Sequence, residues 1–147
     1  MYSVLNICIT SESGKKMESM NSIKVIANKG IVNDRYFKEN NDKKNQITLI
    51  ESENVDYYNK VSGTHLHPTD FRRNVITKGI SLNKLVGKEI LIGDVRLKIH
   101  DLCEPCRYLQ ELLGEKNLVK KLLNRGGLRC ELLTNGNINV NDPIKIL

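Results

Sequence analysis

The chain has 147 residues, of which 39% are hydrophobic and 27% are charged, and this balance excludes both a disordered polypeptide and a membrane-embedded one. The length is typical of one domain, so residues 1–147 are expected to fold as a single unit. The formal net charge of +6 favours an anionic partner, such as nucleic acid, a phosphate group or an oxyanion cofactor.

The first ten residues are predicted to form a strand. They are apolar, but no basic segment precedes them and no small-residue cleavage site follows, so they do not resemble a signal peptide. A cytoplasmic location follows from this, with no membrane association. In that reducing compartment the four cysteines, Cys8, Cys103, Cys106 and Cys130, are expected to stay free, to bind metal or to react.

Strand patterns continue along the chain, with one helix between them. Residues 22–27 place Ile23, Val25 and Ala27 on one face, and residues 46–50 form a short apolar run. Residues 51–61 carry Val55, Tyr58 and Val61 at helical spacing.

The segment 88–100 predicts two strands around a turn at Gly93-Asp94. The second strand alternates strictly, so Val95, Leu97 and Ile99 are expected to point inward. A second helix is predicted over residues 105–124, broken near Gly114 and ended by Gly126-Gly127.

The end of the chain predicts a hairpin followed by a last strand at residues 143–147. Residues 128–133 and 137–140 flank Asn135-Gly136, a dipeptide typical of type I′ turns, which need positive φ at both central positions. Many short strands with few helices indicate a mostly β fold, a β-barrel-like domain with two or three inserted helices. Strands and helices do not alternate regularly, which argues against a parallel α/β fold.

Cys106 is the strongest candidate for chemistry. Pro105 is favoured at the first position of a helix, which would place Cys106 in the first turn, among free backbone N–H groups. That setting, with Arg107 beside it, would stabilise a thiolate, which is both a nucleophile and a soft metal ligand. Cys8 and Cys130 lie in apolar strand patterns and are expected to be structural, whereas Cys103 fits either role.

The Cys-x-x-Cys spacing leaves two alternatives open. A structural zinc site needs four ligands, and His65 and His67 could supply the other two, although their spacing and distance upstream fit poorly. A thioredoxin-like redox dithiol would require a βαβ context, which the pattern lacks.

Basic side chains recur near small or turn-forming residues. Arg72 and Arg73 are adjacent, so on an extended chain at most one would face a pocket, with Asn74 beside it. In the segment 30–36, Asp34 could orient Arg35. Arg125 precedes two glycines that would let backbone N–H groups approach an anion.

Taken in order, these elements resemble the MOSC domain, found at the C-terminus of molybdenum-cofactor sulfurases and as small stand-alone bacterial proteins. The resemblance covers residues 22–147 and is carried by Gly30, Asn33 to Arg35, Gln46 to Glu51, Phe71 to Asn74, Thr77 to Gly79, Leu85 to Gly87, Ile92-Gly93, Pro105-Cys106, Arg125 to Gly127, and Gly136 to Asp142. The family usually has glycine where Asn33 and Asn141 stand. Asparagine tolerates a left-handed backbone best after glycine, so both turns should survive.

The resemblance implies a β-barrel-like fold and a function in binding molybdenum cofactor or carrying sulfur to it. By this likeness Cys106 would be the metal ligand or persulfide site, and Arg72, Asn74, Arg35 and Arg125 would hold the anionic pterin cofactor. Some relatives reduce N-hydroxylated compounds, which implies an electron-donor protein, and a sulfur carrier implies a cysteine desulfurase as partner. The pyridoxal-phosphate domain of the large sulfurases cannot fit in this chain, so pyridoxal phosphate is not expected.

One alternative from another class is a small basic β-barrel that binds nucleic acid. The chain has only five Tyr and two Phe, scattered along the sequence, so it lacks the grouped aromatic side chains on which bases stack. This composition disfavours nucleic acid as a partner.

Overall fold

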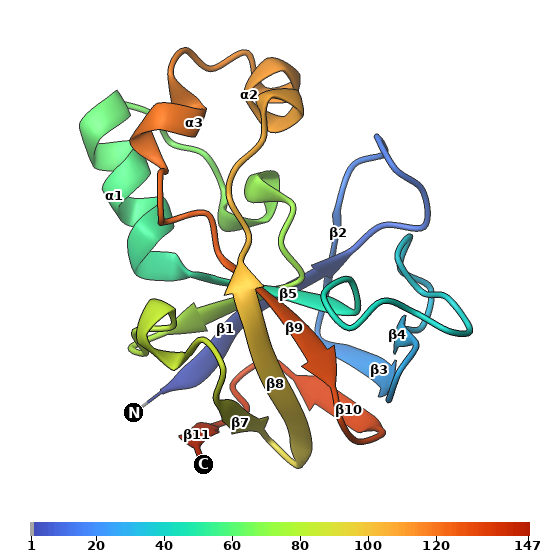
Figure 1. Cartoon of the computed structure of the whole chain (residues 1–147). Helices are drawn as coiled ribbons and strands as arrows, with labels where there is room; N and C mark the ends of the chain where they lie inside the picture. Colours follow the sequence, from blue (N-terminus) through green and yellow to red (C-terminus); the bar gives the residue numbers. More distant parts are fainter. Residues whose placement is uncertain (1) are drawn as a thin grey trace.

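The computed structural model describes residues 2–147, which form two β-sheets and three short α-helices (Figure 1). The larger sheet has the strand order β11-β7-β8-β9-β5-β6-β1-β2, and the smaller sheet has the order β10-β3-β4. In chain order the strands are β1 (Ser3–Ile9), β2 (Glu18–Met20), β3 (Ser22–Ile26), β4 (Gly30–Ile31), β5 (Ile47–Glu51), β6 (Val75–Lys78), β7 (Glu89–Ile92), β8 (Val95–Leu102), β9 (Leu128–Leu132), β10 (Gly136–Asn139) and β11 (Ile144–Ile146). The predicted mostly β class is confirmed.

The larger sheet curls, with β8 and β9 crossing in front of β1 and β5 in Figure 1. Its pairs are antiparallel apart from β5 and β6, which run parallel. The predicted turn at Gly93 is confirmed, because Ile92 and Val95 pair across it. Val95, Leu97 and Ile99 are completely buried, as the alternation predicted.

The central strands are buried on both faces. Ile7, Leu49 and Val75 point into the main core, which fills the inside of the curled sheet together with side chains of β3, β4 and β10. The side chains that follow them, including Ile50 and Ile76, point to the opposite face and pack in a second cluster under the helices. Because both faces of these strands exclude water, their sequences are largely continuous apolar runs and do not alternate between polar and apolar residues.

The helices cover that second face at the carboxyl end of β5 (Figure 1). They are α1 (Ser52–Ser62), α2 (Arg107–Leu113) and α3 (Leu118–Lys121), with short 3-10 turns at Pro68–Phe71 and Asn83–Leu85. Val55 and Tyr58 of α1 are buried as expected, but Val61 is 47% exposed near the end of that helix. None of the helices in residues 2–147 combines the length and the apolar character needed to cross a bilayer.

The hairpin predicted at Asn135-Gly136 is wrong. The strands on either side of it belong to different sheets: β9 pairs with β5 and β8, whereas β10 pairs with β3. Neither residue has positive φ, so no type I′ turn forms. Instead, the Asn135 side-chain oxygen accepts a hydrogen bond from the Ala27 backbone N–H at 2.8 Å, which fixes the crossing between the two sheets.

The second predicted helix has the expected break near Gly114, but both of its predicted ends are wrong. It is interrupted at Gly114, which has a left-handed backbone, but it starts at Arg107, and its last part ends at Lys121. Gly126 and Gly127 lie beyond it, at the entry to β9. Gly127 has a φ of 106°, and a Cβ atom there would collide with the Leu49 carbonyl oxygen, so this position needs glycine for close packing.

Gly127→Ala should therefore lower the free energy of unfolding by about 3 kcal/mol, because it adds backbone strain and overpacking at once. Gly63→Ala is the matched control, since Gly63 also has positive φ but has open space around its Cα. It should lower stability by only about 1 kcal/mol. Urea unfolding of both variants measures the difference, and equal losses would contradict the packing role of Gly127.

Candidate functional site

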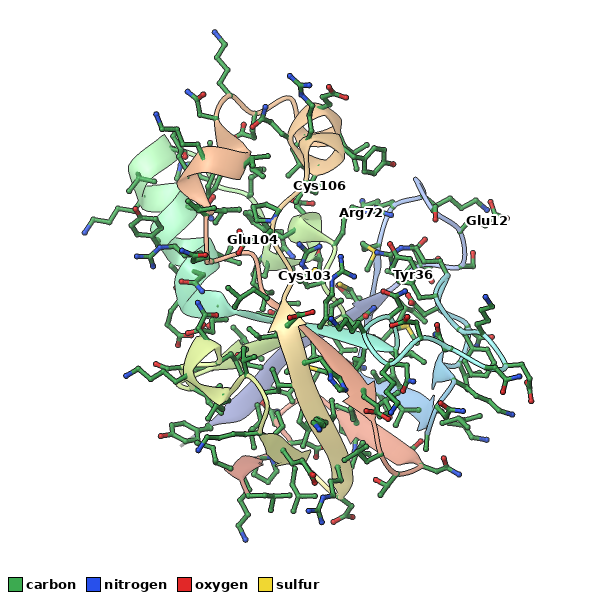
Figure 2. All side chains as sticks on the ribbon, in the orientation of Figure 1. Glu12, Tyr36, Arg72, Cys103, Glu104 and Cys106 are labelled. Atoms are coloured by element: carbon green, nitrogen blue, oxygen red, sulfur yellow. The ribbon has the colours of Figure 1, made fainter. Side chains whose placement is uncertain are left out.

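A surface cleft of about 270 Å³ lies between α2 and the loop that joins β1 to β2 (Figure 2). The residues that line it come from four separate segments of the chain and include three arginines. They are Ser13, Gly14, Arg35, Tyr36, Arg72, Arg73, Cys106, Tyr108 and Leu109. The structure thus brings together three residues that the sequence singled out for the site, namely Cys106, Arg35 and Arg72.

Cys106 is the one exposed cysteine of the four. It is the residue before the first turn of α2, with an extended backbone at φ −107° and ψ 161°. The prediction that Pro105 would start the helix is wrong, because buried Pro105 packs against Gly126 and the helix begins two residues later. Consequently, the Cys106 side chain caps no backbone group and its thiol faces the cleft.

The other three cysteines are buried. Cys8 donates a hydrogen bond from its Sγ to the Arg73 carbonyl oxygen at 3.0 Å, and burial raises the pKa of its thiol to about 12. Burial also raises the pKa of Cys130, which has no exposed surface. The structural roles predicted for Cys8 and Cys130 agree with these surroundings.

Arg72 and Arg73 both line the cleft, contrary to the expectation that only one of them would. The reason is that Arg72 has a left-handed backbone, with φ 61° and ψ 32°, at the end of the 3-10 turn. The chain is therefore not extended there, and two successive side chains can reach one cavity. Arg72 donates to the Lys15 carbonyl oxygen at 2.7 Å, and Arg73 donates to the carbonyl oxygens of Gly126 and Cys103 at 2.7 and 3.1 Å.

Arg35 is the third cation of the cleft. It lies 3.4 Å from the Asp34 carboxylate, donates to the Arg72 carbonyl oxygen at 3.4 Å, and covers the Tyr36 ring with 4.4 Å between guanidinium and ring centre. Its side chain is almost completely buried. These contacts hold a fixed positive charge at the floor of the cleft, and the predicted orienting role of Asp34 agrees with them.

The guanidinium groups still have hydrogen-bonding capacity for a ligand. An arginine has five N–H donors. Within residues 2–147, the hydrogen bonds of Arg72 use one of these donors, and those of Arg35 and Arg73 leave others open. An exposed thiol next to such groups suits a ligand that is anionic and also carries a soft metal or a sulfane sulfur.

Asn74 lies beneath the cleft and does not line it. Its side-chain oxygen accepts from the backbone N–H and the hydroxyl of Thr48, both at 3.1 Å. Its side-chain nitrogen donates to the Cys8 carbonyl oxygen and to the Asp34 carboxylate, at 3.3 and 3.4 Å. Both ends of the amide are therefore used inside the protein, so Asn74 positions the floor of the cleft.

Arg125 is not brought to Cys106. It lies in a different pocket, together with Glu51, Asn54 and Lys84, and this pocket has no lining residue in common with the cleft. The order of the motifs along the chain therefore combined residues from two separate pockets.

Tyr36 and Tyr108 also line the cleft, although the sequence analysis did not single them out. The one sequence feature that could have indicated them is closeness to predicted site residues, because Tyr36 follows Arg35 and Tyr108 comes two residues after Cys106. The Tyr108 hydroxyl also lies against Gly14 of the opposite loop, where a Cβ atom would be 3.4 Å away from it.

The structure does not support the zinc alternative. No group of three or more His, Cys, Asp or Glu side chains in residues 2–147 is placed to hold a metal ion. His67 instead caps the 3-10 turn, where its Nδ1 atom accepts from the Thr69 backbone N–H at 3.2 Å.

Brief treatment of the native protein with iodoacetamide should modify Cys106 alone, because the other three thiols are buried and two of them are further suppressed by a raised pKa. Peptide mass spectrometry measures the label at each cysteine. In urea all four cysteines should react, which controls for reagent strength. Native labelling of Cys8 or Cys130 as fast as Cys106 would contradict the described burial.

Comparison with known proteins finds solved structures of similar fold. The structure is similar to the YUAD protein from Bacillus subtilis, with a TM-score of 0.85 and 18% identity over 99% of this chain and 96% of that one. It is also similar to YiiM from Geobacillus stearothermophilus, with a TM-score of 0.80 and 15% identity over 100% of this chain and 75% of that one. YiiM from Escherichia coli gives a TM-score of 0.71 and 15% identity over 100% and 70% of the two chains.

Those likenesses concern the fold. No curated protein matches the sequence. The family model described as the MOSC domain matches residues 34–145, a range that contains Arg35, Arg72, Arg73 and Cys106. The chain belongs to the MOSC domain family.

Proposed function

We propose that this MOSC domain binds molybdenum cofactor in the cleft, with the Cys106 thiolate as a ligand of the metal. The observation that carries the proposal is the position of one exposed thiol beside the guanidinium groups of Arg35, Arg72 and Arg73. A thiolate is a soft donor suited to such a metal, and arginine provides paired N–H donors that match a phosphate.

The shape of the site supports a ligand larger than a simple ion. A second cavity of about 250 Å³ adjoins the cleft and shares Gly14 and Arg72 with it. Met17, Leu112 and Leu113 give this second cavity apolar walls. The room on both sides of Arg72 falls in the range of roughly 300–1,000 Å³ that small-molecule sites occupy. A pterin ring and its phosphate could therefore be held on opposite sides of the Arg72 side chain.

The residues of this chain would act by binding and orienting the cofactor. Arg35, Arg72 and Arg73 would neutralise its negative charge, and the tyrosine walls would limit its movement. When bound, the cofactor supplies a redox-active metal centre. Reduction of N-hydroxylated compounds by the loaded protein belongs to this proposal and requires a separate electron-donor protein.

Replacing Cys106 with serine should abolish most molybdenum retention, because a hydroxyl is a harder and much weaker ligand than a thiolate. The purified protein is incubated with molybdenum cofactor under reducing conditions, desalted, and measured for molybdenum by elemental mass spectrometry. The unmodified protein should retain close to one metal per chain.

Two arginine variants refine this test. Arg72→Gln should weaken retention by at least about tenfold, because it removes a charged hydrogen-bond donor from the cleft. Arg125→Gln, the matched control outside the cleft, should leave retention unchanged. Equal molybdenum content in the Cys106→Ser variant and the unmodified protein would refute the ligand role of Cys106.

A second candidate function is favoured by the exposure of Cys106. In this proposal the domain carries sulfur: a cysteine desulfurase holds a persulfide, and the Cys106 thiolate attacks its terminal sulfur. The S–S bond of the donor breaks, the donor cysteine leaves as a thiolate, and a persulfide forms on Cys106. The cleft arginines would stabilise the anionic persulfide.

Incubation with a cysteine desulfurase and free cysteine should then add one sulfur atom to Cys106 and none to Cys8 or Cys130, which are buried. Intact-protein and peptide mass spectrometry detect the addition, and Cys106→Ser serves as the control. Absence of the adduct on Cys106, or its equal appearance on the buried cysteines, would rule out the carrier role.

A further inference from the structure

A second polar pocket lies beside the start of α1, on the side of the molecule where α1 and α3 meet in Figure 1. Its volume is about 420 Å³, and we name it the Arg125 pocket. The residues that line it are Glu51, Asn54, Ser81, Asn83, Lys84, Leu123, Asn124 and Arg125. Seven of these eight residues have polar or charged side chains, and none of them lines the Cys106 cleft.

Arg125 is held rigidly at this pocket although its side chain is exposed. Its guanidinium lies over the Tyr57 ring, 3.9 Å from the ring centre, and donates to the Asn54 side-chain oxygen at 3.2 Å. Asn54 is only 8% exposed, and its nitrogen donates to the Glu51 carboxylate at 3.2 Å. A stacked and tethered guanidinium loses little freedom when an anion binds to its remaining N–H groups.

The charges in the pocket favour an anion. Lys84 and Arg125 contribute two cations, and Glu51 is the one carboxylate in the lining. Glu51 is half-buried, and burial is the main cause that raises its pKa. The pocket therefore has an excess of positive charge at neutral pH.

The remaining lining groups suit hydroxyl groups. The Asn83 nitrogen donates to the Asn124 carbonyl oxygen at 2.6 Å, which joins the two segments of the chain that contain these residues. This bond leaves the Asn83 side-chain oxygen as an acceptor, and the Ser81 hydroxyl and the Asn124 side chain are further neutral partners. Such groups can both donate to and accept from an alcohol.

We propose that the Arg125 pocket is a second ligand-binding site, which takes a small phosphorylated polyol. The phosphate would lie against Arg125 and Lys84, and the hydroxyl groups would lie against Ser81, Asn83 and Asn124. This assignment explains why Arg125 is fixed by a buried amide and an aromatic ring far from the Cys106 thiol. It does not depend on what the Cys106 cleft binds.

The test is a titration of the unmodified protein with glycerol 3-phosphate at low salt, followed by two-dimensional amide NMR. Saturable shifts are expected at Ser81, Lys84, Asn124 and Arg125, with no comparable change at Cys106. Inorganic phosphate and glycerol, each titrated alone, should bind more weakly than glycerol 3-phosphate, because each offers only one half of the proposed contacts. Equal binding of inorganic phosphate would overturn the polyol part of the proposal.

Substitutions separate this site from the cleft. Arg125→Gln should weaken glycerol 3-phosphate binding by about tenfold, because it removes a charged, pre-positioned donor. Arg107→Gln is the matched control, since Arg107 is exposed and lines neither site, and it should bind as before. Glu51→Gln should tighten binding by roughly threefold, because it removes the opposing negative charge.

The two sites should respond in opposite ways to the same pair of variants. Cys106→Ser should keep glycerol 3-phosphate binding whatever its effect on molybdenum, and Arg125→Gln should weaken that binding about tenfold while it keeps molybdenum. Failure to detect saturable shifts in the unmodified protein, or an unchanged affinity in Arg125→Gln, would overturn the second site. Neither result would bear on the function proposed for Cys106.

Discussion

The cleft rests on a buried hydrogen-bond network between Asp34 and Asn74. Asp34 accepts from Arg35 and from the Thr10 backbone N–H, at 3.4 and 3.3 Å, while Asn74 joins Asp34 to Thr48 of β5. The Asp34 side chain is only 1% exposed. A charge buried to this extent is tolerated because it is hydrogen-bonded and paired within the protein. The network connects strands β1 and β5 to the loop that carries Arg35. Because these elements are held together, the residues that line the cleft keep fixed positions.

The fold could be predicted where local pattern and tertiary contact agree. Gly93 turns β7 back upon β8, and the alternating side chains that follow point inward, so composition and periodicity were sufficient. Asn135-Gly136 has an even stronger turn signature, yet the Asn135 side chain bonds to Ala27 in the other sheet. A dipeptide indicates only the local backbone conformation that its residues prefer. It does not indicate a hydrogen bond to a residue that lies 108 positions away in the sequence.

The residues that line the cleft could be predicted only in part. Cys106 was singled out from its local sequence and is exposed in the cleft, although the helix starts later than expected, and Asn33 was correctly expected to tolerate a left-handed turn, with φ 73°. Arg73 was set aside on the assumption of an extended chain, which the backbone of Arg72 violates. Arg125 was grouped with the cleft from the order of the motifs alone, and that order does not determine which pocket a side chain lines.

The left-handed backbone of Arg72 has a consequence for how this protein can change. Glycine would relieve about 1 kcal/mol of strain at that position, and asparagine would relieve part of it. Glycine would also remove the hydrogen bond that Arg72 donates to the Lys15 carbonyl oxygen, together with one of the three guanidinium groups that line the cavity. The strained backbone at position 72 is therefore maintained by the side-chain contacts of a residue that is only 9% exposed, and not by the preference of the backbone itself.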